Sequence, residues 1–196
     1  MKERKYKEDW VNETRLDENT GKEIRVPVYR GPVFQRVKGQ GMRSMLLWAF
    51  LPWLFFVALI LLYFRLFFPG STVLYVFLPA ALSLFPALYW GMGIWTLLRD
   101  GSRSRQEKRS GMTRLEKENG AGRVLRSSAG CMICTAASLI GDFVYLCVSG
   151  QASREWPGTV MILAALAFAL GTMNHFRTVN RELESGKTVQ EQDALS

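Results

Sequence analysis

The sequence is poor in the residues from which catalytic and metal sites are built. Its 196 residues include one histidine and three cysteines, and all three cysteines fall in one apolar segment, which provides no disulfide framework. No Ser-His-Asp arrangement and no glycine-rich phosphate loop stands out. The polar segments are also too short to hold a catalytic domain. We therefore expect a protein without enzymatic activity and without a cofactor.

Charges are missing from long stretches of the chain. Hydrophobic residues make up 48% of the sequence and charged residues 21%, but the charges concentrate in 1–43, 99–126 and 177–193. A globular protein would interleave the two classes at helical or strand spacing, so this segregation predicts an integral membrane protein. The first forty residues contain no apolar run, and we expect no signal peptide there. The first span itself should then target the chain to the membrane.

The apolar runs predict the fold class, which is an all-α integral membrane protein with four transmembrane helices arranged as two helical hairpins. About 20 helical residues cross a hydrocarbon layer of roughly 30 Å. The expected spans are about 45–65, 71–98, 127–149 and 158–176. The second span is longer than the membrane is thick, so we expect it to tilt, bend or project.

Three prolines lie within the first two spans. Pro52 falls in the first span, whereas Pro79 and Pro86 share one face of the second. Proline removes a backbone donor, and its ring clashes with the preceding helical turn. We therefore expect helix kinks at these three positions, with neighbouring helices satisfying the freed carbonyl groups.

The polar segments define the rest of the organisation. They are an N-terminal arm at 1–44, a basic loop at 99–126 within the transmembrane domain 45–176, and a tail at 177–196. In the arm, residues 24–28 alternate between apolar and polar at strand spacing after an Asn-Thr-Gly turn. This pattern predicts a small β-hairpin.

The basic loop and the tail contain weaker local signals. Thr113 and Glu116 match a capping box, which predicts a short helix that ends near Gly120. We expect the earlier loop residues 100–105 to be irregular and Pro157 to begin the fourth span. The tail should be helical at first and then frayed.

The distribution of basic residues predicts the topology. Residues 1–43 hold eleven Lys and Arg against seven Asp and Glu, and residues 99–126 hold nine against four. This excess beside apolar runs is the positive-inside signature of a multi-pass plasma-membrane protein, here with both termini in the cytosol. The net charge of +8 could instead indicate nucleic acid. No basic motif interleaved with aromatic residues accompanies it, so we expect no nucleic-acid partner.

Three basic residues without acidic neighbours precede the first span: Arg36, Lys38 and Arg43. They fit a juxtamembrane anchor to anionic lipid headgroups, to which each basic residue contributes roughly 1 kcal/mol. A solvated linker that obeys the positive-inside rule explains them equally well.

Asp142 is the sharpest candidate for chemistry. An acid at the centre of a membrane helix costs roughly 2.5–3.5 kcal/mol on insertion scales, so an ionisable group in a span is by default a candidate proton or ion site. The alternative is a structural hydrogen bond or ion pair with Arg65, Arg154 or a tyrosine hydroxyl. Small residues in this third span, including Gly130 and Gly141, permit close packing and predict that it lies inside the bundle.

A metal site is a second, weaker hypothesis. Cys131 and Cys134 form a CxxC at the expected cytosolic end of the third span, and His175 lies at the same end of the fourth. Antiparallel spans would bring them to the same depth, which permits a Cys₂His site. With one histidine and no second CxxC, cysteines packed as small apolar residues are the better explanation.

Two functional hypotheses follow. In the first, the protein is a non-enzymatic subunit or accessory of a membrane complex, docking through its basic cytosolic face onto a membrane-protein partner or a second copy. In the second, it is a small oligomeric transporter or channel with Asp142 as the coupling site. The small number of polar residues in the spans favours the first.

Overall fold

The structure is a computed structural model that describes residues 9–16, 23–31, 34, 42–67, 74–106, 112–149 and 152–193. Two strands, β1 (Trp10–Leu16) and β2 (Glu23–Tyr29), pair antiparallel with Trp10 opposite Tyr29. Six helices follow: α1 (Met42–Phe67), α2 (Leu74–Leu82), α3 (Leu84–Gln106), α4 (Arg114–Asn119), α5 (Ala121–Ser149) and α6 (Ala152–Asp193). The described chain is therefore mainly helical.

Four of the helical segments are long and apolar enough to cross a membrane, as the hydropathy pattern predicts. Their candidate spans are Arg43–Leu66, Leu74–Arg99, Arg114–Val148 and Trp156–Glu184. Only 22% to 28% of each apolar window is buried inside the protein. Most of the apolar side chains therefore face outward, a surface suited to lipid or to other transmembrane helices.

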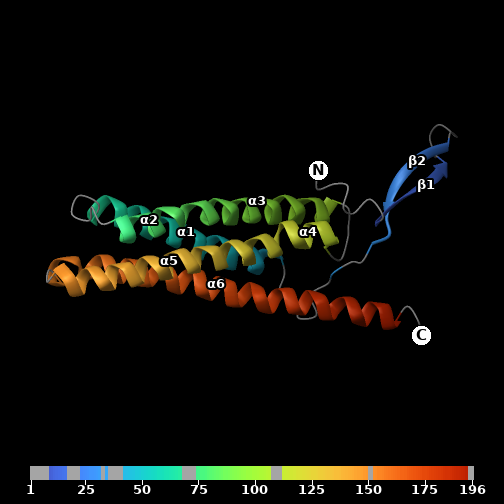
Figure 1. Ribbon diagram of the computed structural model, residues 1–196. Helices are drawn as coiled ribbons and strands as arrows, with labels where there is room; N and C mark the ends of the chain where they lie inside the picture. Colours follow the sequence, from blue (N-terminus) through green and yellow to red (C-terminus); the bar gives the residue numbers. More distant parts are fainter. Residues whose placement is uncertain are drawn as a thin grey trace.

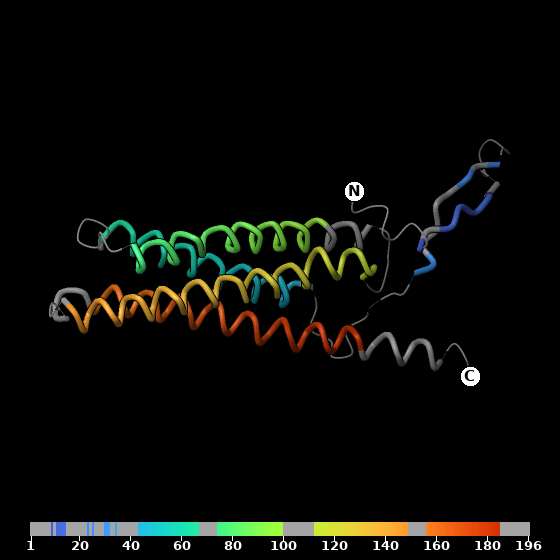
Figure 2. Tube along the Cα trace, viewed as in Figure 1, coloured from blue at the N-terminus to red at the C-terminus, as the bar shows by residue number. Residues whose placement is uncertain are grey.

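The long helices lie side by side along one common direction (Figure 1; Figure 2). α1 packs against α3 and α6, while α5 packs against α2, α3, α4 and α6. We call the end where α1 begins and α3 ends the basic end, and the end where α1 ends and α6 begins the turn end. α4 lies at the basic end, and β1 and β2 lie beyond it (Figure 1).

The interruption of the second span lies at Ser83, between α2 and α3. The Ser83 hydroxyl donates to the Ala80 carbonyl at 2.6 Å, and the Ser83 amide donates to the Pro79 carbonyl at 3.0 Å. Pro86 then falls in the first turn of α3, where backbone N–H groups have no acceptor within the helix, so the N–H that proline lacks is not missed. The two prolines of this span thus flank a single turn.

α1, in contrast, is helical on both sides of Pro52 without an interruption. The next residue ties α1 to α3, because the Trp53 indole N–H donates to the Ala87 carbonyl at 2.8 Å. Large apolar side chains, among them Trp90, Phe56 and Phe176, are fully buried between the helices.

Glycines allow α5 to approach α2 and α3 closely. Pro79 leaves the Tyr75 carbonyl without its helical donor, and a Cβ atom on Gly141 would lie 2.8 Å from that carbonyl oxygen. A Cβ atom on Gly130 would lie 3.0 Å from the Cβ of Pro86. The third span therefore packs at the positions where proline alters the second, and the expected close packing of its small residues is present.

Several helices extend beyond the predicted boundaries. α3 continues through residues 100–105, which were expected to be irregular, and α5 begins at Ala121 rather than near 127. α6 begins before Pro157, which lies inside it, and continues to Asp193. Hydropathy marks where a helix leaves apolar surroundings, but an established helix adds further residues at little cost. Composition therefore underestimates helix length at the membrane boundary.

Candidate functional site

Asp142 lies on α5, seven residues before the helix ends at the turn end. Its side chain is buried, with 5% of the residue exposed, and Thr159 on α6 donates its hydroxyl proton to the Asp142 carboxylate. This hydrogen bond joins the two helices across their packed faces. Because a hydrogen-bonded carboxylate costs less to bury than an unpaired one, Thr159 helps α5 to carry an acid within its span.

Arg65 does not share this site. It lies in the last turn of α1 and is exposed, and among the residues that the structure describes the hydrogen-bond partner of Asp142 is Thr159. Arg154, the other arginine considered, has its side chain outside the described part of the chain. The structure thus brings Asp142 together with a threonine that the sequence did not single out.

The CxxC cysteines and His175 face different neighbours. Cys131 is buried, and its thiol donates to the Ser83 carbonyl at 3.7 Å, whereas Cys134 is half-buried. The His175 ring stacks on Trp48 of α1, with ring centroids 4.9 Å apart. Within the described residues, no group of three or more His, Cys, Asp or Glu side chains could hold a metal ion.

Four buried hydroxyl groups along α5 donate to backbone carbonyls. Three of them donate within α5 itself, and Ser138 donates to the Val76 carbonyl of α2 at 3.1 Å. The four residues are Ser127, Ser128, Thr135 and Ser138. Three of these hydroxyls therefore bond within their own helix, whereas Ser138 joins α5 to α2.

The headgroup anchor proposed for Arg36, Lys38 and Arg43 is placed only in part. Arg36 and Lys38 lie outside the described residues, while Arg43 is exposed in the first turn of α1 at the basic end. An exposed arginine at the start of a span can reach a lipid headgroup.

The segment before α1 is attached to the segment before α4. Phe34 and Met112 form an antiparallel bridge, in which the Phe34 amide donates to the Met112 carbonyl at 2.9 Å and the Met112 amide donates to the Phe34 carbonyl at 3.0 Å. Both side chains are buried. The bridge fixes residues 78 positions apart in sequence (34 to 112) at one place at the basic end.

The helix that follows is held by the expected capping box. The Glu116 amide donates to the Thr113 hydroxyl at 3.3 Å, and the Thr113 amide donates to the Glu116 carboxylate at 2.8 Å. α4 then runs from Arg114 to Asn119 with Gly120 as its C-cap. The prediction of a short capped helix that ends near Gly120 is confirmed.

Lys117 on α4 connects three parts of the chain. Its ammonium group lies 4.5 Å from the centroid of the Phe34 ring and 2.9 Å from the Glu184 carboxylate of α6. The Lys117 side chain is 11% exposed, whereas the Glu184 side chain is 66% exposed. A buried stem with a paired head is a common way to place lysine in packed surroundings. We call Phe34, Met112, Thr113, Lys117 and Glu184 the basic-end clasp.

Sequence reasoning missed this clasp apart from its capping box. Lys117 is one of nine basic residues in the segment 99–126, and it lies between two glutamates. Nothing local distinguishes it, because its partners lie 83 residues before it at Phe34 and 67 residues after it at Glu184.

By length and composition of its helices, the chain is a multi-pass membrane protein with four candidate spans. Comparison with protein-family models, with curated protein sequences and with solved structures gave no match.

Proposed function

We propose that this protein is a non-enzymatic subunit or accessory of a membrane assembly, docking through the basic end. The proposal includes the finer arrangement expected from the sequence: two helical hairpins in the plasma membrane, an N-terminal β-hairpin, and both termini in the cytosol. The partner is a membrane protein or a second copy of this chain.

The observation that carries the proposal is the basic-end clasp. It ties the segment before α1, the helix α4 and the extended end of α6 to one another through the Phe34–Met112 bridge and through Lys117. A surface held in one geometry loses less conformational entropy when a partner binds. The clasp thus supports a docking role for the basic end.

The interior of the bundle supports the same proposal. Between the helices lie fully buried large side chains such as Trp90, Phe56 and Phe176, and the buried hydroxyls of α5 donate to carbonyl groups. A transport pathway needs several polar groups that face one another and are free to bind the solute. The described interior is instead closely packed, and the hydroxyl groups of α5 already donate to carbonyl groups.

Photo-crosslinking in intact cells tests this role. A photoreactive residue at Val11 in β1, which is 42% exposed, should give a discrete crosslinked species. The same group at Leu163, an exposed position within the α6 span, reports lipid and helix neighbours and serves as the matched control. Recovery of a lone monomer in mild detergent, together with an arm that can be deleted without effect on crosslinking or abundance, would contradict the proposal.

The topology has its own test. Reporter domains fused to the C-terminus and inserted in the segment 107–111 should both be active on the cytosolic side. A C-terminal reporter on the opposite side would mean that one of the four candidate spans does not cross the membrane.

The second candidate function is ion-coupled transport, and the buried carboxylate of Asp142 is the observation that favours it. It requires proton or ion flux in reconstituted vesicles that Asp142→Asn abolishes while the protein remains folded. Arg65→Gln, a change at an exposed charge near the same end, is the control. A variant that fails to insert would instead assign Asp142 a structural role.

A further inference from the structure

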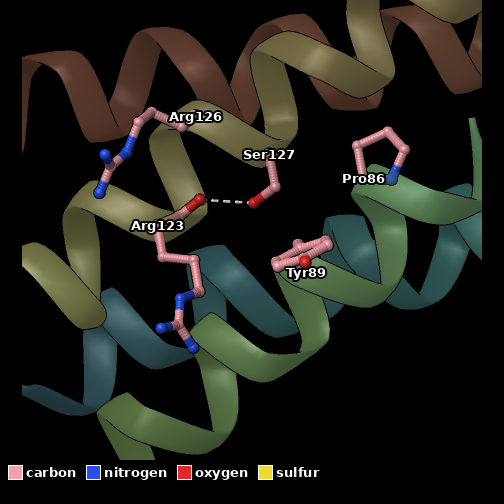
Figure 3. A pocket seen from close by; sticks show the side chains of 5 residues that line it. All are labelled: Pro86, Tyr89, Arg123, Arg126 and Ser127. Carbon is pink, nitrogen blue, oxygen red and sulfur yellow. Dashed lines mark hydrogen bonds between the residues drawn. The ribbon is translucent and has the colours of Figure 1, made fainter. Parts of the chain in front are cut away.

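A pocket lies between α3 and α5 near the basic end of the bundle. Its volume is about 340 Å³, and its lining residues are Pro86 and Tyr89 from α3 with Arg123, Arg126 and Ser127 from α5. In Figure 3 the two arginines occupy one side of the pocket and Pro86 occupies the other, with Ser127 and Tyr89 between them. The pocket therefore has a cationic side and an apolar side.

The arginine side carries positive charge that no described carboxylate neutralises. The Arg123 guanidinium donates to the side-chain oxygen of Asn119 at 3.3 Å. The Arg126 guanidinium donates to the Gly122 carbonyl at 3.1 Å and to the Glu118 carbonyl at 3.5 Å. These neutral acceptors hold the two side chains in place. Each guanidinium has five N–H groups, so most of its donors stay available for a ligand.

The pocket spans the boundary between the polar interface and the hydrocarbon layer. About 20 helical residues cross that layer, and the 20 residues of α5 that end at Val148 begin at Ala129. Arg126 and Arg123 therefore lie at the polar interface. Pro86, which faces Gly130, lies deeper within the span. The cationic side is thus at headgroup level, and the apolar side is at the level of acyl chains.

The pocket also opens toward the lipid. Tyr89 is 61% exposed and Arg126 is exposed, so a molecule that diffuses in the bilayer can reach the site from the side. A volume of this size holds a phosphate and the glycerol attached to it, but not whole acyl chains, which would lie outside along α3.

We propose that this pocket binds an anionic glycerophospholipid of the leaflet at the basic end, with its phosphate between Arg123 and Arg126. Arginine recognises phosphate through paired, charge-assisted hydrogen bonds, and basic pockets between transmembrane helices bind lipid headgroups. The site is separate from Arg36, Lys38 and Arg43, which precede α1 in the chain. The proposal does not depend on the docking function.

The test measures lipid preference in nanodiscs of phosphatidylcholine that contain spin-labelled phosphatidylglycerol or spin-labelled phosphatidylcholine. The wild-type protein should immobilise the anionic label preferentially. Arg123→Gln with Arg126→Gln should lower that preference roughly 30-fold, since two basic contacts are lost. Arg177→Gln with Arg181→Gln removes the same charge from exposed positions of α6 near the same end, and should leave most of the preference intact.

Two further measurements distinguish lipid binding from loss of fold and from binding of free phosphate. Arg123→Lys with Arg126→Lys retains the charge but not the paired hydrogen bonds of arginine. It should therefore restore part of the preference that the glutamine pair loses, which separates loss of binding from loss of fold. Excess inorganic phosphate, compared with chloride at equal ionic strength, should not displace the anionic lipid label. The proposal is overturned if the two glutamine pairs lower the preference equally, if the lysine pair restores nothing, or if inorganic phosphate displaces the lipid with the same dependence on the two arginines.

Discussion

Replacing Gly141 by alanine is the sharpest test of how α5 packs against α2. The added Cβ would lie 2.8 Å from the Tyr75 carbonyl oxygen, a backbone atom that moves only if the helix moves. Overpacking a well-filled contact costs roughly 1–3 kcal/mol. Alanine also favours the helix over glycine by about 1 kcal/mol, so the net loss should be smaller than the clash.

Gly171→Ala is the matched control, because a Cβ atom there meets nothing within 4 Å. Both glycines lie inside helices of the membrane domain, so the gain in helix propensity is common to the two variants. The difference between their free energies of unfolding therefore isolates the clash, and we expect about 1–3 kcal/mol. Gly141→Ala should be the less stable variant.

Reversible unfolding in mixed micelles, driven by added sodium dodecyl sulfate and followed by circular dichroism, measures this difference. Gly141→Ala should unfold at a lower detergent fraction than Gly171→Ala. If the two variants unfold at the same midpoint, α5 can move away from the Tyr75 carbonyl at no cost, and the close approach of the two helices does not stabilise the bundle.

Three further predictions concern polar groups. Asp142→Asn should change the free energy of unfolding by less than about 1 kcal/mol, because an amide oxygen also accepts from Thr159. A large loss of stability would show that the charge itself is required. Thr113→Ala should cost about 1 kcal/mol at the N-cap of α4 and accelerate amide exchange there; unchanged exchange would contradict the capping role. Glu184→Gln should cost under about 1 kcal/mol because Glu184 is largely exposed. Lys117→Ala should lower the thermal midpoint more, and equal losses would refute this asymmetry.

Local sequence signals predicted the parts of the fold that depend on neighbouring residues. The apolar runs indicated four membrane-spanning segments because crossing a hydrocarbon layer is a requirement on composition and length. The capping box at Thr113 and Glu116 indicated α4 because both of its hydrogen bonds join residues three apart.

Proline positions indicate where a helix can bend, and the structure locates one interruption in the second span. The sequence gives equal reason for a kink at each of three prolines; the second span is interrupted at Ser83, between Pro79 and Pro86, and α1 is helical on both sides of Pro52. Which proline breaks a helix depends on the groups that surround it. Ser83 has its own hydroxyl bonded to Ala80, and its carbonyl accepts from Cys131 of α5.

The partners of the charged residues were decided by the tertiary structure alone. Asp142 is hydrogen-bonded to Thr159 across the α5–α6 contact, and Lys117 lies between Phe34 and Glu184, residues that no spacing rule connects to it. The sequence by itself determined that the chain has four apolar helices with basic flanking segments, because burial in lipid is read from composition. Only the packed bundle determined which charges are paired and which, like Arg123 and Arg126, border a pocket, because those distances follow from how distant helices meet.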